Sequence, residues 1–242
     1  DYDMSAAVTL ATELNVFADF QPTLPLDYAQ SDYVFLANID PELQMSVLDQ
    51  VRSPRLTALD TMNYWITSKR DALTEALKRV DIVLINEAEA RQYAGTFNLI
   101  AAARQLLALG PRALVVKKGE YGAVLFLNDS DVTRSCFFAP AYPLERIADP
   151  TGAGDTFAGG FMGFLAGAGQ VTPETIRQAI VHGSVVASFT VEGFSLERLR
   201  SLTMADIRER YDAFRRFTTF EPACPWQGSC ERLREAHRSA TR

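Results

Sequence analysis

Short apolar runs alternate along the chain with segments whose apolar side chains recur at helical spacing. The runs predict strands buried in a sheet, and the helical spacing predicts amphipathic helices. Strands are expected at residues 15–20, 33–37, 56–60, 81–85, 113–116, 122–127 and 136–140. Helices are expected at residues 41–51, 69–79, 87–94, 98–109, 155–168, 173–190 and 204–217. Strands that alternate with helices in this way indicate an α/β fold, with a mainly parallel sheet and helices on both of its faces.

Turn and cap residues support several of these boundaries. Asp40 followed by Pro41 is an N-cap residue before a proline at the first helical position. Gly110 ends a helix, and the two strands that follow it are close enough for a hairpin. Pro140 has no N–H to donate, which places the strand that it ends at an edge of the sheet.

Length and composition suit one domain with a substantial core, since 48% of the 242 residues are hydrophobic. We expect a single domain over residues 1–242, with residues 221–242 as a C-terminal tail. The net charge of -6 gives no electrostatic support for binding nucleic acid or an anionic membrane. No apolar run has the length of a membrane span, and 3 cysteines are too few for a disulfide framework. These features predict a soluble cytoplasmic protein.

Residues 149–160, with the sequence DPTGAGDTFAGG, carry the strongest chemical signal. Gly152 and Gly154 lack the Cβ atoms that would keep the backbone away from a ligand. A helix is expected to begin near Asp155, and its free N–H groups and dipole favour an anion such as phosphate. Asp155 adds an ionised carboxylate that can accept a proton from a hydroxyl group. The pattern suits phosphoryl transfer; a loop that only packs the helix closely, with an acidic residue that only stabilises the helix start, is the alternative.

The same residues resemble the D-x-T-G-A-G-D-x-F-x-G-G pattern of the PfkB (ribokinase-like) carbohydrate and nucleoside kinases. The resemblance implies a ribokinase-like fold of three α/β/α layers. It also implies transfer of the γ-phosphoryl group of ATP, with Mg²⁺, to a hydroxymethyl group of a sugar or, alternatively, of a nucleoside. Asp155 would be the catalytic base, and the backbone N–H groups of Gly152, Ala153 and Gly154 would hold the developing negative charge.

Two further motifs fit the resemblance. Asn86 and Glu89 match the family's N-x-x-E motif, which implies that they arrange magnesium-bound water and nucleotide phosphate, with Glu89 on the metal side. Asn86 is equally well explained as the N-cap of a helix. Lys117, Gly119 and Gly122 resemble the family's nucleotide-contacting turn, in which Lys117 offers a cation to the ATP phosphates. An ordinary hairpin turn explains the two glycines as well.

Weaker candidates lie in the second half of the chain. Ser184 and Gly193 fall near the positions where the family holds adenine, and helix packing explains them equally well. Asp149 and Thr151 resemble positions that in some relatives help to hold a monovalent cation such as K⁺. His182 is expected to be a surface or packed histidine rather than a catalyst.

Strand ends are expected to bring the candidate groups together. Ligands of parallel α/β sheets bind outside the carboxyl ends of the strands. Asn86, Lys117 and Asp149 all lie where expected strands end, so they are predicted to gather on one rim of the sheet. Asp60 and Asn63, just past another strand, would contact substrate or phosphate there, or serve only as a cap and a turn.

The chain departs from the family pattern in its first part. The family's opening strand, its glycine–glycine sugar motif and most of its lid are not visible. The kinase domain is therefore expected to be incomplete on its N-terminal side, with weak or no activity on sugars. The alternative from another class is a non-catalytic module that binds a nucleotide or metabolite. No P-loop or dinucleotide-binding pattern occurs. The expected partner is a small sugar or nucleoside, and a homodimer is left open.

Overall fold

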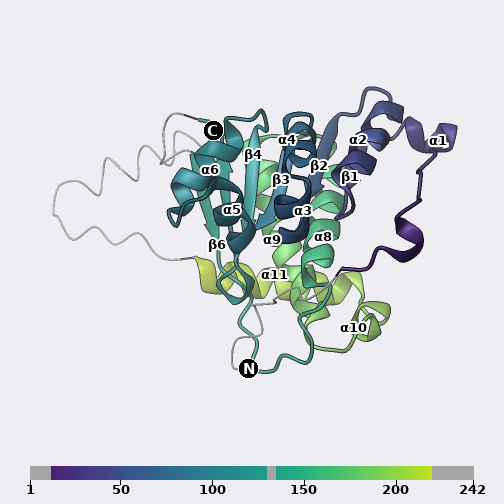
Figure 1. Ribbon diagram of the computed structural model, residues 1–242. Helices are drawn as coiled ribbons and strands as arrows, with labels where there is room; N and C mark the ends of the chain where they lie inside the picture. The colour runs from purple at the N-terminus through teal and green to yellow at the C-terminus, as the bar shows by residue number, and fades with distance from the viewer. Residues whose placement is uncertain (1–11, 130–134, 220–242) are drawn as a thin grey trace.

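A six-stranded sheet runs through the computed structural model, which describes residues 12–129 and 135–219 (Figure 1). The strands lie side by side in chain order, β1 to β6. Strands β1 to β4 are parallel, and β5 pairs antiparallel with both β4 and β6. Their bounds are Tyr33–Leu36 (β1), Leu56–Asp60 (β2), Ile82–Asn86 (β3), Ala113–Lys117 (β4), Ala123–Leu127 (β5) and Cys136–Ala139 (β6).

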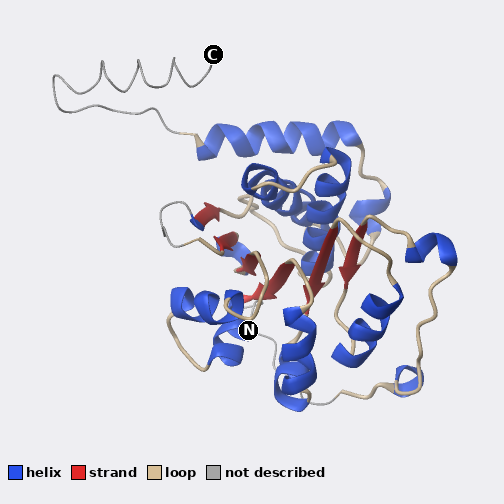
Figure 2. Cartoon of the chain, turned by 90° about the horizontal axis from the view of Figure 1, so that it is seen from above, coloured by secondary structure: helices blue, strands red, loops and turns tan. Residues whose placement is uncertain are grey.

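Helices cover both faces of this sheet, which gives three layers (Figure 2). One face packs against three helices of the C-terminal half: α8 (Ala153–Ala168), α9 (Pro173–Thr190) and α11 (Met204–Thr218). The other face packs against earlier helices: α2 (Pro41–Gln50), α4 (Arg70–Lys78), α5 (Glu87–Ala94) and α6 (Leu99–Leu107). Short helical elements complete the described chain: η1 (Asn15–Phe17), α1 (Leu26–Ala29), α3 (Asn63–Ser68), η2 (Gly119–Tyr121) and α10 (Glu197–Arg200).

Alternation along the central strands divides the apolar side chains between two cores. In β3, Ile82 and Leu84 belong to the core shared with α8 and α9, whereas Val83 and Ile85 belong to the core on the opposite face. All four side chains are fully buried. Burial of each such side chain contributes about 1.5–3 kcal/mol, so the central strands and their ends are firmly placed.

Two glycines let α8 and α9 approach closely. A Cβ on Gly160 would stand 3.1 Å from the Cα of Gly183, and a Cβ on Gly183 would stand 2.7 Å from the carbonyl oxygen of Phe157. A side chain at Gly183 would clash with backbone, and one at Gly160 would require its neighbours to shift by a few tenths of an ångström. Gly160, in the second half of the glycine-rich motif, therefore lies at the contact between α8 and α9.

Most of the expected elements are confirmed, with two corrections near the start of the chain. Residues 15–20, expected as a strand, contain the short helix η1, in which Val16 is 85% exposed. They lie at the periphery of the molecule, where no sheet core orders them as a strand (Figure 1). Strand β1 was expected to be buried on both faces, but Tyr33 and Phe35 are half-buried because β1 is an edge strand of the described sheet.

The remaining expectations concern short helices, the tail and membranes. The short helices α1, α3 and α10 did not follow from the apolar spacing. The expected tail at residues 221–242 lies outside the described residues. Among the residues that the structure describes, no helix combines the length and apolar character needed to cross a membrane.

Candidate active site

The glycine-rich loop leads into a helix start that no side chain caps. Gly152 is the N-cap of α8 and has φ = 80°, a left-handed conformation that favours glycine. The helix begins at Ala153, earlier than expected, which places Asp155 in its first turn. The N–H of Ala153 donates to the carbonyl of Pro150 at 3.1 Å. Of the three backbone amides expected to hold negative charge, that of Ala153 therefore already has a partner.

Contacts with the end of α9 hold this loop in place. The carbonyl of Val191 accepts the N–H of Ala148 at 2.8 Å. The hydroxyl of Thr190 donates to the hydroxyl of Thr156, in the first turns of α8, at 2.9 Å. The start of α8 is thus tied to the end of its neighbouring helix.

Asp149 and Thr151 interact with each other within the loop. The N–H of Thr151 donates to Oδ1 of Asp149 at 2.9 Å, and this bond lowers the pKa of Asp149. The expectation that Asp149 directly follows a strand is wrong, because β6 ends at Ala139 and a long loop leads to Ala153. A role of Asp149 and Thr151 in holding K⁺ stays a prediction.

Lys117 connects the sheet to the start of α8. It is the last residue of β4 and pairs with Asn86 of β3, so both lie at the carboxyl ends of parallel strands, as expected. Its Nζ atom lies 3.2 Å from the position that a Cβ on Gly154 would occupy. The missing Cβ of Gly154 therefore lets the ammonium group rest against the first turn of α8. The side chain of Lys117 is 20% exposed, which leaves part of its charge accessible to a ligand.

Asp60 ends β2 and forms an ion pair with Lys117. Its Oδ2 atom lies 3.8 Å from Nζ of Lys117, and the residue is only 4% exposed. Burial raises the pKa of Asp60 to about 6; Lys117 opposes this rise, and the negative charge of Asp155 adds to it. Asp155 itself is exposed on α8 rather than turned into the core. Asp60 and Asp155 are thus close enough to interact, one buried and one open to solvent.

Sequence reasoning gave too little weight to Asp60. Its position at the end of an apolar run was the only signal, and that signal did not show its burial or its pairing with Lys117. Asn63, the other weak candidate in this region, is the first residue of α3.

Asn86 and Glu89 close the start of α5 with a capping box. Oδ1 of Asn86 accepts the N–H of Glu89 at 2.8 Å, and Oε2 of Glu89 accepts the N–H of Asn86 at 3.0 Å. The N-cap interpretation of Asn86 is therefore confirmed. Burial raises the pKa of Glu89, while the N–H of Asn86 and the charge of Lys117 oppose the rise. Glu89 thus belongs to the same electrostatic cluster as Lys117 and Asp60.

The turn between β4 and β5 needs its glycines for backbone reasons. Gly119 and Gly122 have φ values of 56° and 91°. A Cβ on Gly122 would stand 2.1 Å from the carbonyl oxygen of Ala139, at the end of β6. The hairpin interpretation of both glycines is confirmed, and their contact with a nucleotide stays a prediction.

The candidates on α9 are packed residues. Ser184 is 9% exposed. The ring of His182 stacks between those of Phe164 and Tyr211, with centroid distances of 4.4 Å and 4.6 Å, and burial lowers its pKa. The expectation of a packed histidine is confirmed. An adenine contact by Ser184 or by Gly193, just after α9, stays a prediction.

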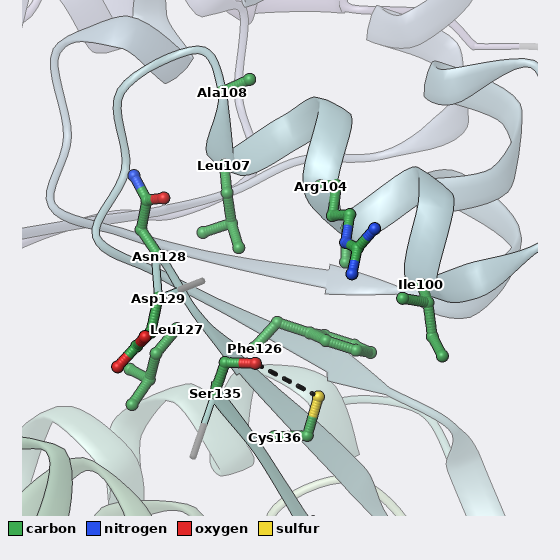
Figure 3. Close-up of a pocket in the computed structure, with 11 residues that line it drawn as sticks. Ile100, Arg104, Leu107, Ala108, Phe126, Leu127, Asn128, Asp129, Ser135 and Cys136 are labelled. Atoms are coloured by element: carbon green, nitrogen blue, oxygen red, sulfur yellow. Dashed lines mark hydrogen bonds between the residues drawn. The ribbon is translucent and has the colours of Figure 1, made fainter. Parts of the chain in front are cut away.

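A cavity of about 120 Å³ opens elsewhere, between α6 and the strands β5 and β6 (Figure 3). Arg104, Phe126 and Cys136 are among its lining residues. None of the candidate site residues lines it. The candidate site is therefore defined by the cluster around Lys117 rather than by this cavity.

The comparison with protein families agrees with the motif and with the fold. The sequence profile described as "pfkB family carbohydrate kinase" matches residues 7–198. The chain belongs to the PfkB family.

A relative of known activity and two solved structures resemble this PfkB chain. A cytidine kinase of Thermococcus kodakarensis is 35% identical over 143 residues, which are 57% of this chain and 49% of that protein. The chain thus spans about half the length of this relative.

The two solved structures establish the ribokinase-like fold. The nucleoside kinase of Methanocaldococcus jannaschii is 20% identical with a TM-score of 0.63, over 82% of this chain and 60% of that chain. A protein of E. coli described as ribokinase II, solved with ATP and Mg²⁺, is 18% identical with a TM-score of 0.60, over 75% of this chain and 59% of that chain.

Proposed function

We propose that this chain provides the phosphate-transfer site of an ATP-dependent kinase whose acceptor is the hydroxymethyl group of a nucleoside. The observation that carries the proposal is the position of the Lys117 ammonium group, which rests against Gly154 at the uncapped start of α8. The exposed carboxylate of Asp155 lies in the same turn. A cation, a helix N-terminus and a base are thus combined at the carboxyl ends of parallel strands.

The start of α8 would bind the phosphates. Helix N-termini attract anions through free N–H groups and the helix dipole, and the left-handed Gly152 leaves the approach free of a side chain. Lys117 would add a full positive charge beside these amides. Such charge neutralisation is the main task of a protein in phosphoryl transfer, because the transition state is loose.

Asp155 would accept the proton of the acceptor. The hydroxymethyl oxygen forms a bond to the γ-phosphorus while the bond from that phosphorus to the β,γ-bridging oxygen breaks, and ADP leaves. The hydroxyl proton passes to the carboxylate of Asp155. General-base catalysis of this kind typically contributes about 10²–10⁴-fold to the rate.

Glu89 is the residue that fits a magnesium ion. Bound Mg²⁺ would neutralise charge on the ATP phosphates. Mg²⁺ keeps several waters and takes few protein ligands. The capping box uses Oε2 of Glu89, so Oε1 is the oxygen that would face a metal-bound water.

The acceptor is proposed from the relative rather than from the geometry. The protein that is 35% identical is a cytidine kinase, which favours a nucleoside over the free sugar that the motif alone suggested. Both acceptors present a hydroxymethyl group on a sugar ring, so the same base and anion site would serve either.

The test compares Asp155→Asn with the unchanged chain. Turnover is measured with ATP and, in turn, cytidine, adenosine, ribose and fructose, and MgATP binding is measured by calorimetry. We expect turnover to fall by about 10²–10⁴-fold, with MgATP affinity changed by less than about threefold. Asp212→Asn, which removes an exposed carboxylate from α11, is the matched control and is expected to change neither quantity.

Each result has a defined meaning. Phosphorylation of the nucleosides alone supports the proposed acceptor, and phosphorylation of the sugars alone replaces it. Equal turnover in Asp155→Asn and the unchanged chain would exclude Asp155 as the base. If the unchanged chain does not bind MgATP, the phosphate-transfer proposal fails.

A nucleotide-binding module without catalysis is the second candidate. The uncapped start of α8 and the Lys117 ammonium group account for phosphate binding without any catalytic step. This candidate predicts that MgATP binds and that none of the four acceptors is phosphorylated.

A further inference from the structure

The ion pair between Asp60 and Lys117 places the ammonium group at one definite point. Nζ of Lys117 lies 3.8 Å from Oδ2 of Asp60 and 3.2 Å from the Cβ position of Gly154. The two side chains come from β2 and β4, on opposite sides of β3. The carboxylate thus draws the lysine side chain across the end of the intervening strand, toward the first turn of α8.

The backbone of Asp60 is itself fixed by a buried glutamine. Gln44 of α2 is 1% exposed, and its Nε2 group donates to the carbonyls of Leu36, Ala37 and Asp60 at 3.2, 3.0 and 3.1 Å. These bonds join the ends of β1 and β2. The carboxylate of Asp60 therefore projects from a rigid strand end, as a positioning group must.

Stability does not explain a carboxylate at this position. Burying a charge is unfavourable unless its hydrogen bonds are satisfied. Oδ1 of Asp60 is buried without a hydrogen-bond partner among the described residues, although the backbone N–H of Asn38 favours the charged form of the carboxyl group. An apolar side chain of similar size would fit the end of this buried strand better. Because Asp60 is only 4% exposed, it is shielded from a ligand, whereas the side chain of Lys117 is 20% exposed.

Two other carboxylates belong to the same electrostatic cluster. Glu89 interacts electrostatically with Lys117, and Asp155 is close enough to affect Asp60. A lysine without a fixed partner would turn toward either of them. Pairing with Asp155 would neutralise the proposed base, and pairing with Glu89 would remove the cation from the start of α8.

We infer that Asp60 is a positioning residue that holds the Lys117 ammonium group against Gly154, where it meets the phosphates of ATP. This inference rests on the proposed function. Asp60 acts through Lys117 and does not itself touch the nucleotide. The positioning role therefore predicts that a change at Asp60 affects MgATP binding only while Lys117 is present.

The test is a double-mutant cycle on MgATP binding, measured by calorimetry with the full chain. We expect Lys117→Met to weaken binding by about tenfold, the lower end for a charged hydrogen bond. Asp60→Asn is expected to weaken it by about fivefold, because the ammonium group is no longer held in place. The double variant is expected to match Lys117→Met within about twofold, since Asp60 has nothing to position once the cation is gone.

A matched control removes a paired carboxylate at the opposite, N-terminal ends of the parallel strands. Asp81 lies just before β3, and its Oδ2 atom accepts hydrogen bonds from the N–H and the hydroxyl of Thr57. Its Oδ1 atom lies 3.6 Å from Nε of Arg112. Asp81→Asn is expected to leave MgATP affinity unchanged. Circular dichroism checks the fold of each variant. If Asp60→Asn does not fold, Asp60→Ser replaces it with the same expectation.

The outcomes separate this inference from the proposed function. If Lys117→Met weakens MgATP binding while Asp60→Asn does not, the positioning role is overturned and the phosphate site stands. If the two losses multiply in the double variant, Asp60 acts independently of Lys117, which also overturns the inference. If the unchanged chain binds no MgATP, both fail.

Discussion

The two long helices that pack together on one face of the sheet, α8 and α9, begin in opposite ways. At the start of α9, the hydroxyl of Thr172 accepts the N–H of Thr175 at 3.2 Å, and the hydroxyl of Thr175 accepts the N–H of Thr172 at 2.8 Å. At the start of α8, Gly152 offers no side chain, and Lys117 lies against the first turn instead. One helix start thus has side-chain caps, and the other has none.

The difference shows where this fold can leave a helix end open. A side-chain cap contributes about 1 kcal/mol. Helix α8 does without it because Phe157, Phe161 and Leu165 are buried against the sheet and α9. Packing of a single apolar residue of this size outweighs the missing cap. The missing cap therefore destabilises the fold only slightly. The uncapped start lies at the rim where Asn86 and Lys117 end their strands.

The largest expected effect concerns the pH dependence of stability at the open end. The folded-state pKa of Asp60 is about 6, above the ordinary value of 3.8, because of burial. The folded state therefore holds this proton more tightly than the unfolded state, and the contribution of Asp60 to stability falls as the pH rises from about 4 to about 6. This pH-dependent contribution to stability is absent in Asp60→Asn, because asparagine does not titrate.

Urea unfolding of both proteins at about pH 4 and about pH 7 checks this expectation. Relative to the unchanged chain, the free energy of unfolding of Asp60→Asn is expected to increase by about 2–3 kcal/mol over this range. Parallel pH profiles for the two proteins would mean that Asp60 is not strained by burial. Burial of the charged cluster at the start of α8 would then destabilise the folded state no more than the capped start of α9 does.

The sequence pattern predicted the sheet well where burial was uniform. The runs at 56–60, 81–85 and 113–116 are largely buried on both faces, so they appear as mainly apolar segments, and the structure contains β2, β3 and β4 there. The run at 15–20 has similar composition but lies outside the sheet, and composition alone does not distinguish the two situations.

The sequence predicted individual residues of the site but not the contacts between them. Motif spacing selected Asn86, Lys117 and Asp155, each at an element boundary. It did not select Asp60 as a partner of Lys117, because their contact crosses an intervening strand and depends on the sheet order. Nor did it show that a side chain at position 154 would crowd Nζ of Lys117.

A smaller effect is expected from a methyl group placed between Lys117 and α8. The Cβ of Gly154→Ala would stand 3.2 Å from Nζ of Lys117, so the ammonium group must move by a few tenths of an ångström. We expect MgATP affinity to fall by about fivefold, or about 1 kcal/mol, without loss of thermal stability. Calorimetry and thermal unfolding measure the two quantities.

Gly163→Ala on the same helix is the matched control. A Cβ at Gly163 has no atom within 4 Å, and the residue is exposed. This variant is expected to gain about 0.5–1 kcal/mol of stability from the higher helix propensity of alanine, with unchanged MgATP affinity. If both variants bind MgATP equally well, the contact between Lys117 and Gly154 has no role at the open helix start.

The smallest expected effect concerns the capped helix. Thr172→Ala removes the hydroxyl that accepts the N–H of Thr175, so it is expected to cost about 1 kcal/mol of unfolding free energy. Thr172→Ser keeps the acceptor and is expected to cost less. The site lies at the opposite end of α9, where Thr190 contacts Thr156, so MgATP affinity is expected to stay the same in both variants. A loss of affinity in Thr172→Ala would show that the two helix starts are energetically coupled through α9, and that capping at one end supports the open start at the other.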